Sequence, residues 1–189
     1  MTENSIFEPE GRAVPYFDEG EGPVALVLIS ASGPDNDGLG VVSHYLAEEA
    51  GFRVLRVGAR AGSDDLALDE RAADVLAVMD HVGLHDSWIG GHGFGGSVAR
   101  AFTATHAERA NGLLLLGVEE STTPLAPTIP VLIVQATGDE ITPPANGNRL
   151  QATAPERASI KVIDGADHHF PMTHPIETSV IIEEYLDWD

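Results

Sequence analysis

The order of apolar and polar residues predicts strands and helices that alternate along the chain. Residues 24–29 form a continuous apolar run of buried-strand length, and residues 39–50 carry apolar side chains at helical spacing before Gly51. The same two patterns repeat to the end of the sequence. They predict further strands at 52–57, 88–90, 112–118, 131–136 and 158–163, and further helices at 69–82, 95–106, 144–153 and 176–186.

This alternation is typical of an α/β protein with an open, mostly parallel sheet and helices on both faces. The 189 residues fit one such domain, which we expect to span residues 1–189. In sheets of this kind, functional groups gather at the carboxyl ends of the strands. The loops at these ends are predicted at residues 30–38, 90–96, 137–144 and 164–171.

The loop at residues 90–96 reads GGHGFGG and joins a short strand to a helix. A Gly-x-Ser-x-Gly sequence in this position would form a nucleophile elbow, which lifts a serine hydroxyl above the sheet. Here Gly93 occupies the place of the serine. Glycine keeps the tight turn but supplies no hydroxyl, so covalent acyl-enzyme chemistry at this position is excluded.

Four segments, in order along nearly the whole chain, resemble the α/β-hydrolase family. GRAVPYFDEGEGPVALVLI and GGHGFGGSVA resemble the family's opening strands and its elbow. IPVLIVQATGDEITPP resembles the strand and turn that carry the catalytic acid, and IDGADHHFPMTHP resembles the histidine loop. The resemblance implies a catalytic acid at Asp139 and a catalytic histidine at His168, in the chain order that is usual for the family.

The resemblance also implies an oxyanion hole formed by the backbone N–H groups of Phe94 and Ser32. Two departures accompany Gly93. Ser30-Ala31 stands where the family usually has His-Gly, and only a short segment follows the strand at 112–118, where the family often inserts a lid. We therefore expect a small member of the family with a minimal lid or none, and a rather open site.

An aspartate–histidine dyad without a serine can still act as a general base. We expect Asp139 and His168 to perform acid–base chemistry on a small neutral substrate, by water-mediated hydrolysis, elimination, isomerisation or cyclisation. Two alternatives stay open. The first is a non-catalytic protein that binds a ligand in the same pocket, and the second is a serine esterase in which glycine has been substituted for the nucleophile.

Other polar side chains lie near the elbow in the sequence. Ser97, Ser30 and Ser32 are alternative nucleophiles, and we also expect His92 and Ser30 to line the pocket. The Asp-His-His run at 167–169 could suggest a metal site, but adjacent loop residues rarely converge on one ion. We therefore expect no bound metal.

The elbow glycines also allow a different interpretation. Gly91, Gly93 and Gly96 spell G-x-G-x-x-G after a strand and at the start of a helix, as in dinucleotide sites. Glu119, at the end of the next strand, could serve as the ribose acid. This hypothesis leaves the resemblance at residues 139 and 168 unexplained, so we expect no cofactor.

The net charge of the chain restricts the classes of partner that it can bind. The net charge is −20, from 30 acidic and 10 basic residues, and the chain has no cysteine. Such a surface repels nucleic acid and disfavours polyanionic substrates and anionic membranes, so we expect a small-molecule substrate or ligand as the partner. The sequence starts without a basic and apolar signal segment, and we therefore expect a cytoplasmic protein. No pattern indicates the oligomeric state.

Overall fold

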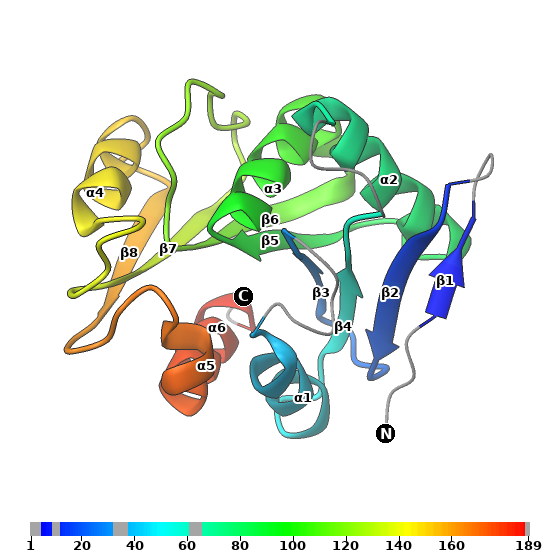
Figure 1. The fold of residues 1–189 in the computed structure, drawn as a ribbon, viewed down its shortest axis with the longest axis horizontal. Coiled ribbons are helices and arrows are strands. Elements are labelled where there is room, and N and C mark those ends of the chain that lie inside the picture. The colour runs from blue at the N-terminus through cyan, green and yellow to red at the C-terminus, as the bar shows by residue number, and fades with distance from the viewer. Residues whose placement is uncertain (1–4, 9–11, 32–37, 61–65, 188–189) are drawn as a thin grey trace.

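A computed structural model describes residues 5–8, 12–31, 38–60 and 66–187. Its centre is an eight-stranded sheet in the order β1-β2-β4-β3-β5-β6-β7-β8 (Figure 1). The strands are β1 (Ser5–Phe7), β2 (Val14–Glu19), β3 (Ala25–Ile29), β4 (Arg53–Val57), β5 (Ser87–His92), β6 (Ala110–Leu116), β7 (Val131–Ala136) and β8 (Ala158–Ile163). The helices are α1 (Gly40–Glu48), α2 (Leu68–His81), α3 (Phe94–Thr105), the short 3-10 helix η3 (Ala107–Arg109), α4 (Pro144–Ala152), α5 (Phe170–Thr173) and α6 (Pro175–Leu186).

The sheet is parallel from β4 through β8, and among the described strands only β2 runs against this direction, since β1 is antiparallel to β2 and β2 is antiparallel to β4. The prediction of an open, mostly parallel sheet is therefore confirmed. The strand β1 was not predicted, because three residues are too few to show an alternating pattern. The four-residue helix α5 was missed as well, since one helical turn is too short to show a period.

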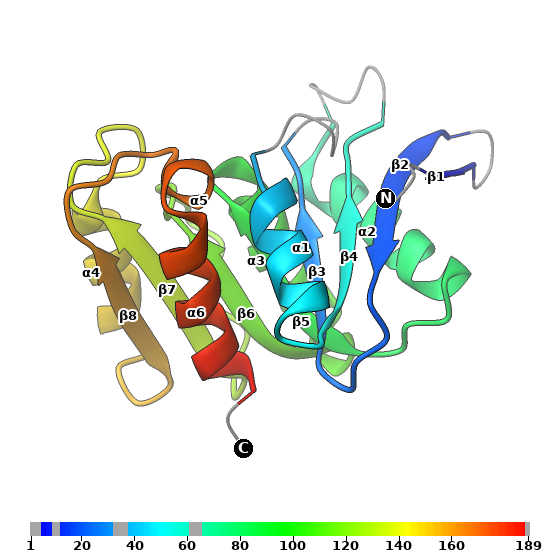
Figure 2. The ribbon, with the colours of Figure 1, turned by 90° about the horizontal axis from the view of Figure 1, so that it is seen from below.

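Helices cover both faces of the sheet, as the sequence predicts. In Figures 1 and 2, α2, α3 and α4 lie on one face and α1, α5 and α6 lie on the other. Alternate side chains of one strand enter the two cores between these layers: Val27 and Ile29 pack on the α2–α3 side, and Leu26 and Leu28 on the α1–α6 side. Burial on both faces explains why the central strands read as unbroken apolar runs.

The strand β5 is longer than the predicted strand at 88–90 and reaches His92. The predicted strand ended at Gly90, and Gly91 was assigned to the loop alone, yet both glycines are paired residues of the strand. At Gly90 the reason is steric, because a Cβ there would lie 2.8 Å from the Leu114 side chain on the neighbouring strand. The glycine therefore allows close packing inside the sheet instead of marking its end.

The connection from β6 to β7, residues 117–130, contains no helix or strand. No lid domain is inserted there, which agrees with the expectation of a minimal lid. Within the described ranges, no helix has the length and apolar character needed to cross a membrane.

Candidate active site

The turn between β5 and α3 places Gly93 at the carboxyl end of the central strand. Gly93 has φ +56° and ψ −117°, a backbone conformation that residues with a side chain adopt only at a cost. Its N–H donates to Leu116 O on the next strand (2.9 Å), and its carbonyl accepts from Gly96 N (3.0 Å). These two bonds hold the tight strand-to-helix turn of a nucleophile elbow.

Two neighbouring glycines are required by contacts inside the protein. A Cβ at Gly95 would lie 2.0 Å from Ile29 O, and a Cβ at Gly91 would lie 2.3 Å from the backbone carbon of Gly95. The helix α3 can therefore approach β3 and β5 only because these positions lack side chains. Packing thus accounts for Gly91, one of the three glycines of the pattern that could also indicate a dinucleotide site.

A different situation holds at Gly93, where a side chain would fit. A Cβ built there lies 3.4 Å from both Cε1 and Nε2 of His168, an ordinary van der Waals distance. The imidazole of His168 thus faces the position that a serine side chain would occupy.

His168, in the loop between β8 and α5, contacts Asp139, in the loop between β7 and α4. His168 Nδ1 lies 3.0 Å from Asp139 Oδ2, and the carboxylate is fully buried. An ionised carboxylate only accepts hydrogen bonds, so Nδ1 carries the proton and Nε2 is the basic nitrogen of the neutral ring. The structure therefore brings together the two residues that the sequence resemblance singled out, with Nε2 directed toward Gly93.

Asp139 is held in place by Thr142 as well as by His168. The amides of Ile141 and Thr142 donate to Asp139 Oδ1 (2.9 and 2.8 Å), and the Thr142 hydroxyl donates to Oδ2 (2.5 Å). Burial acts to raise the pKa of Asp139, but the hydrogen bonds from Thr142 and the contact with His168 outweigh it and hold the pKa below its ordinary value. Asp139 is therefore ionised at neutral pH.

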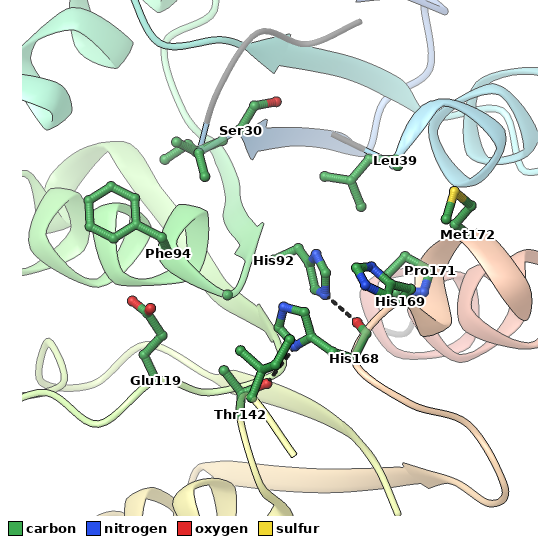
Figure 3. Close-up of a pocket in the computed structure, with 15 residues that line it drawn as sticks. Ser30, Leu39, His92, Phe94, Glu119, Thr142, His168, His169, Pro171 and Met172 are labelled. Atoms are coloured by element: carbon green, nitrogen blue, oxygen red, sulfur yellow. Dashed lines mark hydrogen bonds between the residues drawn. The ribbon is translucent and has the colours of Figure 1, made fainter. Parts of the chain in front are cut away.

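His92 packs against His168 (Figure 3). The two rings are stacked with their centroids 4.4 Å apart, and His92 Nε2 lies 2.7 Å from the backbone oxygen of His168. Because a carbonyl can only accept, Nε2 of His92 is the donor. Burial, and next the neighbouring His168, lower the pKa of His92 to about 4. His92 is therefore neutral at physiological pH and anchors the backbone of the histidine loop.

A cavity of about 490 Å³ opens above Gly93. Ser30, His92 and Phe94 line it, whereas Ser32 lies outside the described residues. In Figure 3, Phe94 and Glu119 stand on one side of the histidines, and Leu39, Pro171 and Met172 stand on the other. The cavity is therefore lined mainly by apolar residues, and its polar side chains include Ser30 and Glu119 as well as the histidines.

Comparison with known proteins agrees with this geometry. Residues 31–172 match the sequence profile described as the alpha/beta hydrolase family. The chain belongs to the alpha/beta hydrolase family. The match spans the elbow, the loop that carries Asp139 and the loop that carries His168.

Solved structures of other alpha/beta hydrolases superpose on nearly the whole chain. A thermophilic esterase from Thermogutta terrifontis is 18% identical, with 98% of each chain covered and a TM-score of 0.81. MGS-MChE2, an alpha/beta hydrolase enzyme from the metagenome of sediments of the Mar Chica lagoon, Morocco, is 20% identical over 97% of this chain and 98% of its own, also with a TM-score of 0.81. At such low identities, the likeness shows the shared fold.

Two residues of this alpha/beta hydrolase site were not found in the sequence. Thr142 was overlooked, although the spacing Asp139-x-x-Thr142 is typical of a carboxylate that caps the turn following it. Glu119 was considered only as a ribose acid, yet it lines the cavity and accepts a hydrogen bond from the Ser97 hydroxyl (2.6 Å). That bond occupies the hydroxyl proton of Ser97, one of the alternative nucleophiles.

Proposed function

We propose that this alpha/beta hydrolase performs acid–base chemistry through Asp139 and His168 without a covalent intermediate at residue 93. The observation that carries the proposal is the position of His168, whose Nδ1 lies 3.0 Å from Asp139 while Nε2 faces the Gly93 turn. In this arrangement Nε2 takes a proton from a water molecule or from the substrate, and Asp139 stabilises the imidazolium that forms. A positioned general base of this kind contributes about 10²–10⁴-fold to a rate.

The missing side chain at Gly93 leaves room for the reacting group. A serine oxygen would stand one bond beyond a Cβ that is 3.4 Å from His168 Nε2. Without that serine, a water molecule or a substrate C–H or O–H group can occupy the same position next to the base. Water-mediated hydrolysis is one outcome, and elimination, isomerisation or cyclisation are others of the same proton-transfer class.

Phe94 is the proposed donor to a developing oxyanion. It is the first residue of α3, where backbone N–H groups have no partner within the helix and the helix dipole favours negative charge. An oxygen above Gly93 would thus receive a hydrogen bond from the Phe94 amide, and Ser32 is the proposed second donor.

The lining of the cavity supports a small, neutral and fairly apolar substrate. Leu39, Ile141 and Met172 supply apolar surface, and Ile141 and Met172 are more than half exposed at the entrance. Glu119 adds a carboxylate, which repels an anionic substrate.

The first test is labelling with a fluorophosphonate probe, read by intact mass, on the native chain and on Gly93→Ser. We expect no label on the native chain, one label on Gly93→Ser, and none on Gly93→Ser combined with His168→Ala. This result requires the elbow, the dyad and the oxyanion donors to be assembled. Labelling of the native chain would instead identify another serine as the nucleophile, and the absence of any label on Gly93→Ser would contradict the proposed geometry.

The second test concerns the native chemistry. A panel of small neutral esters, lactones and epoxides is incubated with the native chain and with His168→Ala, and products are followed by mass spectrometry. Turnover that depends on His168 supports the proposal. Ligand binding without any product would favour the non-catalytic alternative, to which the absence of a hydroxyl at Gly93 points. Esterase activity that appears only in Gly93→Ser would favour a serine esterase that has been substituted at its nucleophile.

A further inference from the structure

A second cavity, of about 990 Å³, lies beneath the connection from β6 to β7. In Figure 1 this connection passes between α3 and α4, and residues of both helices line the cavity. Leu68, Leu125 and Leu150 give it apolar surface. This second cavity shares Glu119 with the cavity above Gly93, called the elbow cavity from here on. Neither Asp139 nor His168 belongs to the lining of the second cavity. It is therefore a separate space on the α2–α3 side of the sheet.

Arg100, on α3, is the unusual residue of this second cavity. Arg100 is only 4% exposed, and its Nη2 donates to the backbone oxygen of Thr123. Its Nε has no hydrogen-bond partner, and within the described ranges no carboxylate lies at ion-pair distance from it. Burial, with no acid to oppose it, lowers the pKa of Arg100. A buried cation in this state is costly to the fold unless an anion joins it.

The acidic side chains around the cavity have partners other than Arg100. Glu119 accepts a hydrogen bond from Ser97 (2.6 Å), and Glu120 pairs with Arg149 (3.0 Å). A third arginine of the lining, Arg157, donates to the backbone oxygen of Ile129 (3.0 Å). Three of the ten basic residues of a chain with net charge −20 thus surround one cavity. Only the charge of Arg100 is both buried and unmatched among them.

We propose that this second cavity binds a monocarboxylate with a short apolar body, whose carboxylate pairs with Arg100. The planar guanidinium offers parallel N–H groups that match the two oxygens of a carboxylate. The leucines of the lining receive the apolar body. A single negative charge fits better than a polyanion, because Glu119 and Glu120 stand at the same cavity. The proposal does not depend on the chemistry proposed for His168.

The test is calorimetric titration with hexanoate, with hexanamide as the neutral match and inorganic phosphate as the alternative anion. We expect hexanoate to bind, hexanamide to bind at least about tenfold more weakly, and Arg100→Met to lose at least about tenfold in hexanoate affinity. Arg109→Met is the matched control, because Arg109 is paired with Asp80 away from the cavity (2.7 Å), and it should leave the affinity unchanged. His168→Ala should also leave it unchanged, which distinguishes this site from the elbow cavity.

Circular dichroism verifies that Arg100→Met is folded. A crystal structure of the native chain with hexanoate gives a second readout that needs no variant, and it should place the carboxylate at hydrogen-bond distance from Arg100. Equal hexanoate affinity of Arg100→Met and the native chain would overturn the proposal. So would binding of phosphate in place of hexanoate, binding that is lost in His168→Ala, or no binding at all. The fluorophosphonate result on Gly93→Ser has no bearing on any of these outcomes.

Discussion

The two sides of the elbow cavity are built by different forces. On the histidine side, the polar side chains of Asp139, Thr142 and His168 are joined by hydrogen bonds of 2.5 to 3.0 Å. On the elbow side, the turn is held by backbone bonds of Gly93 and by close contacts that only glycine permits at Gly95 and its neighbours. One side depends on side-chain chemistry, and the other depends on the absence of side chains.

This difference explains why the shape of the site does not require a side chain at residue 93. The elbow turn does not depend on a side chain at residue 93, because its shape follows from the packing of the surrounding glycines. The histidine side does not depend on that residue either, since Asp139 and Thr142 already fix the ring of His168. Glycine at residue 93 therefore leaves both sides in place.

The largest expected effect comes from adding one methyl group to the elbow at Gly95. A Cβ in Gly95→Ala would meet Ile29 O at 2.0 Å, and neither backbone can move without separating α3 from β3. We expect a loss of more than about 4 kcal/mol in the free energy of unfolding, or failure to fold. Urea denaturation followed by circular dichroism measures it.

Gly93→Ala is the matched control for that variant. The added methyl group has space, since its nearest contacts are His168 atoms at 3.4 Å, and only the positive φ of +56° opposes it. A cost of about 1–2 kcal/mol is expected. Equal costs at residues 93 and 95 would show that the elbow is not held by glycine packing.

The next effect tests the histidine side through pH. His92 has its pKa lowered to about 4, against an ordinary value of 6.5, so the unfolded chain binds a proton at this residue more readily than the folded chain. The stability that depends on a neutral His92 is fully present above pH 6.5. As the pH falls toward 4, the free energy of unfolding decreases by up to about 3 kcal/mol. Chemical denaturation between pH 4 and pH 7 measures this loss.

His92→Gln removes the titration and keeps an amide N–H that can donate to the carbonyl of His168. The variant should show a shallower pH dependence over the same interval, whereas His85→Gln, at an exposed position, should follow the native chain. If His92→Gln follows the native curve, then the anchoring of the histidine loop by a neutral His92 is wrong.

The fold could be predicted because each strand or helix is indicated by a pattern of apolar residues within its own segment. Strands at 131–136 and 158–163 were predicted with the bounds that the structure has, since the first is a mostly apolar run of buried length and the second alternates apolar and polar residues around Lys161. The extent of β5 was wrong because a glycine that packs in a sheet and a glycine that ends one look alike in a sequence. Only the partner strand, with Leu114 against Gly90, distinguishes them.

Sequence motifs predicted some residues of the candidate site and not others. Asp139 and His168 stand in segments with a recognisable order, and the structure places them together. Thr142 belongs to no such motif, and the buried Arg100 reads as an ordinary polar position of a helix. Their importance comes from what surrounds them in three dimensions, which a single sequence does not contain.

Thr142 gives the last and smallest of the expected effects. Thr142→Val keeps the shape of the side chain but removes the hydroxyl that donates to Asp139 Oδ2 at 2.5 Å. The loss of a hydrogen bond to a buried carboxylate should cost about 1.5 kcal/mol in the free energy of unfolding at neutral pH. Thr142→Ser, which retains the hydroxyl, should recover most of it.

The same variant also tests the cause of the lowered pKa of Asp139. Because this pKa lies below its ordinary value, Asp139 stabilises the native fold at neutral pH, and the contribution is lost as the pH falls through the folded-state pKa. Removing the Thr142 donor raises that pKa toward the ordinary value, so Thr142→Val should lose less stability on acidification than the native chain. If Thr142 holds the carboxylate ionised, the difference in free energy of unfolding between the native chain and Thr142→Val is therefore smaller at pH 3 than at pH 7. Denaturation curves of both proteins at the two pH values measure it. A constant difference between the two proteins would mean that the Thr142 hydroxyl does not act through the ionised carboxylate, and that the lowered pKa of Asp139 has another cause.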